Sequence, residues 1–160
     1  MEEYLYSIQK VGKFNLFSLN KVCNILYLAG KDMSAKYNLQ HWNNCYLKDL
    51  LIVLLCNIKN QIYIVKQYNL VVATFQINVR QEELCFQKLA TNPVYAGHGV
   101  GSYCMREIEN IAKNLGLKTV VCEVYDKSLH AKEFYEKRGY SVYGTVDTLK
   151  YTELKMKKII

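Results

Sequence analysis

Proline and glycine are both scarce in this sequence: its 160 residues include one proline and eight glycines. No stretch of about 18 uncharged apolar residues occurs, which argues against a membrane-spanning helix. The opening residues MEEYLYSIQK lack the pattern of a secretory signal peptide, so we expect a cytoplasmic protein. No segment is of low complexity, and 51% of the residues are hydrophobic. This composition excludes a disordered chain and suits one domain with a real core.

Cysteine patterns of the kind that bind metals are also missing. None of the six cysteines stands in a CxxC pair or at zinc-finger spacing to a histidine, so we expect no metal site. All six lie in apolar or amphipathic segments, where a free cysteine packs like a small hydrophobic residue. We therefore expect reduced structural thiols, with Cys85 and Cys122 as the candidates for a reactive one.

Acidic residues are outnumbered by basic ones. The chain has 21 Lys and Arg against 14 Asp and Glu, a net charge of +7, which favours attraction to anions. Nucleic acid and a phosphorylated cofactor are both candidate anions. The lysines are spread along the chain rather than clustered, which makes nucleic-acid binding the weaker interpretation.

The first half of the chain predicts two helices and an antiparallel meander. An apolar stripe predicts a helix from Phe14 to Ala29, and residues 33–58 predict a loop followed by a second, more buried helix. Runs rich in β-branched and aromatic residues predict strands at 4–11, 61–67, 70–79 and 84–91.

The second half changes character and predicts a β-α-β unit. Apolar positions from Cys104 to Leu115 fall on one face of a helix that begins near Gly101 and is terminated by Gly116. The apolar run 119–124 predicts a strand buried on both faces. A helix at 128–139 and strands at 140–146 and 151–157 complete one mixed α/β domain over residues 1–160.

The turn YAGHGVGS, Tyr95 to Ser102, holds three of the eight glycines. It lies between a strand that ends near Thr91 and a helix whose first N–H groups are unpaired and carry partial positive charge. Together these features predict an anion site, most naturally for a phosphate or pyrophosphate. The turn lacks the lysine of a P-loop, and its GxGxG spacing and late position do not fit a dinucleotide-binding fingerprint.

The segment LATNPVYAGHGVGSYCM resembles the acetyl-CoA motif of the GNAT superfamily of N-acetyltransferases, which reads R/Q-x-x-G-x-G/A after a strand ending like L-A-V-x-P. The matching positions are Leu89, Ala90, Thr91, Pro93, Gly99 and Gly101, whereas Ala96 stands where the family has Arg or Gln. A second block, SLHAKEFYEKRGYSVYG, resembles N-x-x-A-x-x-F-Y-x-K-x-G-F. It matches at Ala131, Phe134, Tyr135, Lys137, Gly139 and Tyr140, and Ser128 replaces the usual Asn.

The two blocks cover about residues 84–146, and the resemblance implies the GNAT fold. That fold is α/β of the α+β type: a mixed central sheet of about six to seven strands, flanked by about four helices. Its first half is antiparallel, and a parallel pair of strands splays apart in the middle. A homodimer is common for this fold, and the last strand is the expected contact.

The resemblance also implies where acetyl-CoA binds. Pantetheine is expected between the splayed strands, paired with the backbone of Leu89, Ala90 and Thr91. The pyrophosphate is expected on the amides of the turn, at Gly97, His98, Gly99, Val100, Gly101 and Ser102. Ser128 is expected to hydrogen-bond in place of the family's Asn, and the His98 side chain is expected to face either phosphate or solvent.

The implied reaction is direct acetyl transfer to a primary amine in a ternary complex. By resemblance, Tyr135 donates a proton to the departing thiolate. Glu123, raised in pKa by burial, is the first candidate for the base, and Glu82 and Glu83 are the others. An acetyl-cysteine route through Cys85 or Cys122 is a minor alternative.

The acceptor site is expected among the first helices and the loop around YNLQHWNN, with His41, Trp42 and Tyr46 as candidate lining residues. A small-molecule amine and a protein amine both fit, and the positive net charge argues weakly against polyamines. The alternative to an enzyme is an acyl-CoA-binding module of the same fold without transferase activity, which the departures at Ala96 and Ser128 favour.

Overall fold

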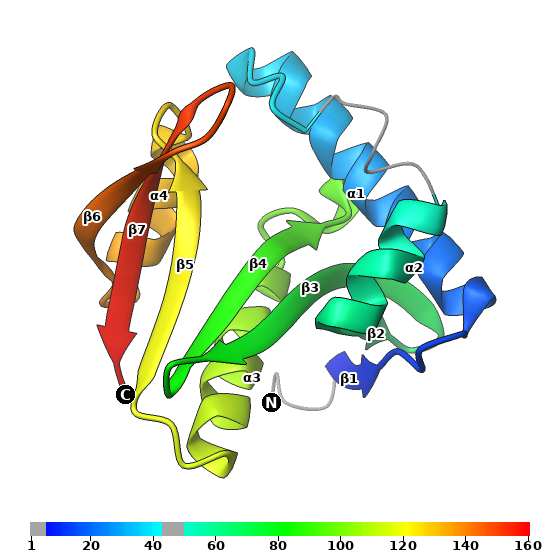
Figure 1. Cartoon of the computed structure of the whole chain (residues 1–160). Coiled ribbons are helices and arrows are strands. Elements are labelled where there is room, and N and C mark those ends of the chain that lie inside the picture. The colour runs from blue at the N-terminus through cyan, green and yellow to red at the C-terminus, as the bar shows by residue number, and fades with distance from the viewer. Residues whose placement is uncertain (1–5, 43–49) are drawn as a thin grey trace.

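The structure, a computed structural model, describes residues 6–42 and 50–160 (Figure 1). This part of the chain forms seven strands and four α-helices. The strands are β1 (Tyr6–Lys10), β2 (Gln61–Gln67), β3 (Leu70–Arg80), β4 (Glu83–Thr91), β5 (Thr119–Tyr125), β6 (Ser141–Asp147) and β7 (Thr152–Ile159). The helices are α1 (Leu16–Tyr37), α2 (Leu50–Lys59), α3 (Val100–Asn114) and α4 (Leu129–Glu136), with a short 3-10 helix, η2 (Pro93–Tyr95).

All seven strands join one sheet in the order β1-β2-β3-β4-β5-β7-β6. Every neighbouring pair is antiparallel except β4 and β5, which run parallel. This is the GNAT arrangement that the two motifs imply, so the predicted fold class is confirmed. The last strand, β7, lies inside the sheet between β5 and β6, and the edges are β1 and β6. The last strand therefore has no free edge with which to pair a second copy, and a dimer contact through it stays a prediction.

The helices cover the two faces of the sheet and create two cores. On one face, α1 and α2 bury an apolar cluster against β2 and β4 that includes Leu19, Leu26 and Ile62. On the other face, α3 packs on a larger cluster that draws buried side chains from β3, β4, β5 and β7. Figure 1 shows α2 in front of β3 and α3 behind it.

Helix α1 is longer than the sequence predicts. The apolar stripe is buried as expected, and the side chain of Asn15 caps the first turn by accepting from the Ser18 N–H at 3.0 Å. The helix then continues to Tyr37, so the predicted loop from residue 33 is wrong at its start. Gly30 does not end the helix, because it provides close packing: a Cβ there would lie 3.1 Å from the Trp42 carbonyl oxygen.

Helix α2 is more exposed than predicted. Of its ten residues only Val53 and Asn57 are buried, whereas Leu51, Leu55 and Ile58 are about half or more exposed. The prediction rested on apolar content alone. In the fold, α2 is an outer helix that contacts α1 and β2 with one narrow side.

Within the described residues, the predicted strands and the later helices are confirmed, with ends that differ by at most three residues.

Candidate functional site

The parallel pair β4 and β5 stays together over a very short distance. Only Leu84, Cys85 and Phe86 of β4 pair with β5, at Val120, Val121 and Cys122. Beyond these pairs the strands separate, while β5 stays paired with β7 up to Tyr125. Figure 1 shows the wedge between the two strands. The predicted splay is therefore confirmed, and the β4 edge over residues 87–91 has no strand partner on that side.

A bulge lies in this free part of β4. The register with β3 shifts between Thr74 and Gln76, and Lys88 opposite the shift has a positive φ of 50°. Bulges of this kind bend a strand and redirect its side chains. The bulge therefore adds to the divergence of β4 from β5 at the point where their pairing stops.

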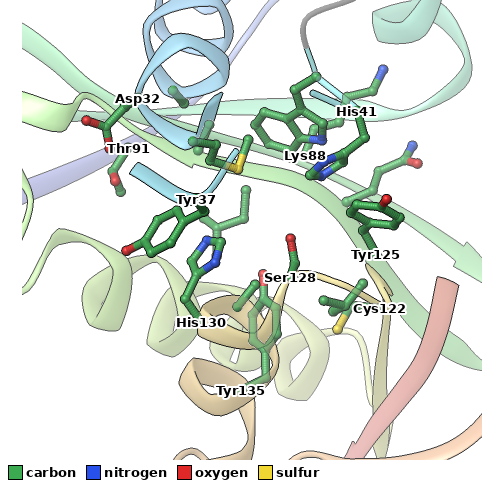
Figure 2. A pocket seen from close by; sticks show the side chains of 18 of the residues that line it. Asp32, Tyr37, His41, Lys88, Thr91, Cys122, Tyr125, Ser128, His130 and Tyr135 are labelled. Carbon is green, nitrogen blue, oxygen red and sulfur yellow. The ribbon is translucent and has the colours of Figure 1, made fainter. Parts of the chain in front are cut away.

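The wedge opens into a pocket of about 640 Å³ (Figure 2). Its walls come from the end of α1, the free part of β4, the end of β5, the start of α4 and the start of β7. Among the predicted site residues, the pocket brings together His41, Trp42, Leu89, Ala90, Thr91, Glu123, Ser128 and Tyr135. Tyr46 lies outside the described residues. The pocket is thus bordered by both the predicted cofactor strand and the predicted catalytic residues.

The glycine turn follows η2 and ends at the first residue of α3. Gly97 and Gly99 have φ values of 79° and 81°, a conformation that L side chains rarely adopt. In the part of the chain that the structure describes, the backbone N–H groups of Gly97 and of residues 99–102 have no protein acceptor. A second hollow of about 670 Å³ borders this turn and is lined by Gly97, His98 and Gly99, among others. The geometry is that of an anion site at a helix N-terminus.

Two contacts that the sequence did not reveal hold the turn in place. The Tyr6 hydroxyl donates to the His98 carbonyl oxygen at 2.8 Å, so β1 anchors a turn 92 residues away. The His98 ring folds back on the turn, with Nδ1 3.0 Å from the Ala96 carbonyl oxygen. Ala96 itself is exposed and has no side chain that can reach an anion.

Gly101 has a packing role in addition to its place in the turn. A Cβ at this position would lie 3.1 Å from the Phe134 ring, so α3 and α4 approach each other closely here. Arg138 completes this joint: it donates to the Ser102 hydroxyl at 2.5 Å and to the Phe134 carbonyl oxygen at 2.7 Å. Its guanidinium also lies 3.6 Å from the centre of the Phe134 ring. A basic side chain therefore stands beside the start of α3, although the family's usual basic position is Ala96.

Tyr135 extends from α4 toward the pocket, and its hydroxyl points into the cavity (Figure 2). Its ring is held by edge contacts with Phe86 at 5.6 Å and Phe134 at 5.2 Å. Burial raises the pKa of Tyr135 well above its ordinary value of 10. The phenol is therefore protonated at neutral pH and can act as a proton donor.

Glu123 lines the pocket, but its side chain is exposed, so the expectation that Glu123 is buried is wrong. Its neighbours Cys122 and Val124 point into the core under α3, and Glu123 therefore faces the opposite side of the sheet.

A second carboxylate, Glu153 on β7, also lines the pocket, and its pKa is raised by burial and then by the charge of Glu123. In the sequence, only the alternation of polar and apolar residues along β7 could have placed Glu153 on the face of the sheet that borders the pocket. Glu82 and Glu83 do not line the pocket.

Aromatic rings surround the acceptor end of the pocket. His41 lies 4.5 Å from Tyr125 and 6.0 Å from Tyr151, and the two tyrosine rings are 5.0 Å apart. Burial lowers the pKa of His41, and the nearby His130 lowers it further. The buried His41 Nδ1 has no hydrogen-bond partner among the described residues. The sequence pointed to His41 and Trp42 but missed both tyrosines.

The thiols near the wedge are protonated. Cys122 lines the pocket and Cys85 lies on the paired part of β4, and burial raises the pKa of both. All cysteines of the described part are free, as expected. Within the same part, no group of acidic, His and Cys residues is placed to hold a metal ion, and no helix is long and apolar enough to cross a membrane.

Comparison with known proteins gives one family and many similar folds. Residues 29–140 match the family described as Acetyltransferase (GNAT) family. The PaiA N-acetyltransferase of Thermoplasma acidophilum, solved in complex with coenzyme A, superposes with a TM-score of 0.80 at 15% identity, over 97% of this chain and 99% of that chain. The ribosomal-protein-S18-alanine N-acetyltransferase of Escherichia coli gives a TM-score of 0.68 at 16% identity, over 97% and 94%.

An acetyltransferase from Streptococcus agalactiae gives a TM-score of 0.72 at 17% identity, over 98% of this chain and 99% of that chain. Comparison with curated protein sequences finds no match. At these identities the structures establish a shared fold, and the family match covers the wedge, the glycine turn and most of α4.

Proposed function

The chain belongs to the GNAT family of acetyltransferases, and from this premise we propose that it moves the acetyl group of acetyl-CoA directly to a primary amine in a ternary complex. It is an acetyl-CoA-dependent N-acetyltransferase, and the acceptor and the catalytic residues are the proposal. The observation that carries the proposal is the wedge: an unpaired edge of β4 faces a pocket into which the Tyr135 hydroxyl points.

The residues around the wedge fit acetyl-CoA, which supplies an activated acyl group as a thioester. The free edge at Leu89, Ala90 and Thr91 offers backbone groups to the amides of pantetheine, as a neighbouring strand would. The unpaired N–H groups of Gly97 and of residues 99–102 suit a pyrophosphate. Ser128 is buried at the start of α4 and lines the pocket, which supports a hydrogen bond to the cosubstrate.

In this proposal Tyr135 is the general acid. The amine nitrogen forms a bond to the acetyl carbonyl carbon, the carbon–sulfur bond breaks, and the sulfur leaves with the bonding electron pair. The Tyr135 hydroxyl gives its proton to that sulfur, the amide nitrogen loses the extra proton of the attacking amine to water, and the Tyr135 phenolate regains a proton from water. Its raised pKa keeps the proton on the phenol until the thiolate forms.

Glu123 is the proposed base. An amine enters as an ammonium ion and must lose a proton before its nitrogen can attack, and a carboxylate can accept that proton through a water molecule. Tyr135 packs on the α3 face of the sheet, and Glu123 faces the other side. The proposed acid and base therefore lie on opposite sides of the gap. This arrangement suits a reaction in which the amine attacks from one side and the thiolate leaves on the other.

Replacing Tyr135 by Phe tests the acid role. We expect kcat to fall by about 100-fold or more, because general acid catalysis contributes about that much. The Kd of acetyl-CoA, measured by calorimetry, should stay within about twofold. Tyr140→Phe is the matched control, because Tyr140 is also a buried phenol in this aromatic group but does not line the pocket. Full turnover in Tyr135→Phe would exclude the acid role.

Replacing Glu123 by Gln tests the base. We expect a lower kcat/KM and a changed pH profile of acetylation, with Glu83→Gln as the control at the far end of the gap. An unchanged profile in Glu123→Gln would remove this residue from the mechanism.

A module that binds acyl-CoA without transfer is the second candidate. It is favoured by the departures at Ala96 and Ser128, since Ala96 is exposed and offers no side chain to the phosphates. A thermal melt with acetyl-CoA and with desulfo-CoA, followed by a screen of amines for CoA release, separates the two. Binding without release of CoA for any amine would favour the module.

A further inference from the structure

The acceptor end of the pocket contains two polar side chains, His41 and Glu153, that find little satisfaction among the described residues. The buried Nδ1 of His41 has no hydrogen-bond partner among the described residues, and the half-buried side chain of Glu153 forms no ion pair there. A buried polar group that lacks a partner costs free energy, so such groups commonly mark a place where a ligand supplies the missing donor. A carboxylate and an imidazole at one end of a pocket suit a ligand group that carries several N–H donors.

The walls around these acceptors suit a cation. The rings of His41, Tyr125 and Tyr151 lie within 4.5–6.0 Å of one another. Aromatic faces attract ammonium groups, and the attraction grows when water is excluded. We name this end of the pocket, formed by His41, Tyr125, Tyr151 and Glu153, the distal subsite. Burial and the charge of Glu123 raise the pKa of Glu153, as expected for a carboxylate without a cationic partner.

The sheet register sets the spacing between the distal subsite and the proposed base. Tyr125 stands opposite Glu153, and Glu123 stands opposite Lys155. Glu123 and Glu153 are therefore diagonal neighbours on one face of β5 and β7, about 7–8 Å apart along the backbone. A short aliphatic chain bridges such a distance, with one amine at each carboxylate.

We propose that the acceptor is a linear diamine whose far ammonium group binds in the distal subsite while its near amine reaches the gap beside Glu123. This inference rests on the proposed acetyl transfer and adds the class of its substrate. It runs against the expectation from the net charge of +7, because the charge at the acceptor end is set by local carboxylates rather than by the whole surface.

Lys36 lines the pocket and is paired with Asp32 at 3.0 Å, and two further lysines lie near this path. Lys88 lines the pocket, but its ammonium group is directed to the Cys56 thiol at 3.5 Å, on α2. Lys155 pairs across the strands with Glu123 but does not line the pocket. Neither forms an ion pair with Glu153 within the described residues, and the carboxylate remains available to the ligand.

The test compares three acceptors of similar length with the full chain and acetyl-CoA. Cadaverine carries a far ammonium group, pentylamine a methyl group, and δ-aminovalerate a carboxylate. We expect cadaverine to have the lowest KM, pentylamine a KM about tenfold higher, and δ-aminovalerate the highest. In Glu153→Gln the KM for cadaverine should rise about tenfold, whereas the KM for pentylamine stays the same.

Glu136→Gln is the matched control, because Glu136 is an exposed carboxylate on α4 that does not line the pocket. It should behave as the wild type with all three acceptors. Equal KM values for cadaverine and pentylamine, or an equal effect of Glu153→Gln on both, would overturn the diamine proposal.

Binding measurements separate a failure of this inference from a failure of the proposed function. If no amine is acetylated although acetyl-CoA binds, acetyl transfer to amines is refuted. The distal subsite is then tested by calorimetry of cadaverine and pentylamine against the enzyme saturated with CoA. Tighter binding of cadaverine that is lost in Glu153→Gln supports the subsite, and equal binding overturns it.

Discussion

At the scale of single residues, Arg138 stands where the sequence motif lacks a basic group. The family's Arg or Gln is replaced by Ala96, but the guanidinium of Arg138 donates to the Ser102 hydroxyl beside the first turn of α3. A cation at this place opposes the positive end of the helix unless an anion lies between them. Arg138 is therefore in position to support the phosphates of CoA.

Replacing Arg138 by Gln should weaken CoA binding. We expect the Kd of CoA, measured by calorimetry, to rise by about tenfold, since a charge-assisted hydrogen bond contributes about 1.5–3 kcal/mol. Arg106→Gln is the control, because Arg106 is an exposed arginine on the same helix and lies over the Tyr103 ring. A Kd that does not change in Arg138→Gln would mean that Arg138 serves only the joint between α3 and α4.

The half-buried histidines His41 and His130 make stability depend on pH. Burial lowers the pKa of His41 and His130 below the ordinary value of 6.5. Below about pH 6.5 the unfolded chain takes up protons that the folded chain resists, so their contribution to stability is lost as the pH falls. Each such proton adds a slope of at most about 1.4 kcal/mol per pH unit.

We therefore expect the wild type to lose more stability between pH 7 and pH 5 than His41→Asn does, as measured by urea unfolding. Glu153, whose pKa is raised, acts in the opposite sense, and comparing the two proteins at each pH removes its contribution. His98→Asn, on the exposed turn, is the control. A constant difference between wild type and His41→Asn at all pH values would contradict the lowered pKa.

At the scale of elements, the free edge of β4 should respond to the cosubstrate. In this segment Gln87, Ala90 and Thr91 keep their pairing with β3, but the groups that face the wedge are open. Amide exchange of this segment should be fast for those N–H groups and should slow by about tenfold or more when CoA binds. Exchange in β2, which pairs on both sides, should not change. Equal exchange with and without CoA would speak against pantetheine pairing on this edge.

The helices and strands also show how much of the fold could be predicted from the sequence. The strands followed from β-branched runs, and the wedge followed from two motifs that lie on β4, α3 and α4. The length of α1 did not, because the apolar stripe stops at Ala29 and the last turns of the helix, residues 31–37, are partly or fully exposed. The exposure of α2 was missed because apolar content does not tell which side faces the core.

The acceptor end was the part least accessible to sequence analysis. Tyr125 and Glu153 meet only because β5 and β7 pair in a particular register, and His41 joins them from the segment after α1. Such a group has no signature along the chain. The proposed catalytic pair, by contrast, came from motif positions, and the structure adds that Glu123 is exposed.

At the scale of the whole molecule, the two halves of the sheet share few strand contacts but one core. Only three residue pairs join β4 to β5, whereas the cluster under α3 runs through β3, β4, β5 and β7 without a break. Lys158 on β7 and Glu109 on α3 add an ion pair at 2.9 Å across this joint. The protein can therefore keep an open wedge without separating into two parts.

The open wedge also predicts an order of events for the proposed catalytic cycle. Until the thioester lies along β4, an amine in the pocket has no wall on one side and no carbonyl carbon to approach. Turnover should accordingly follow a compulsory sequence, with acetyl-CoA first to bind and CoA last to leave. In steady-state kinetics, CoA should inhibit competitively against acetyl-CoA at every amine concentration, and the acetylated amine should never do so.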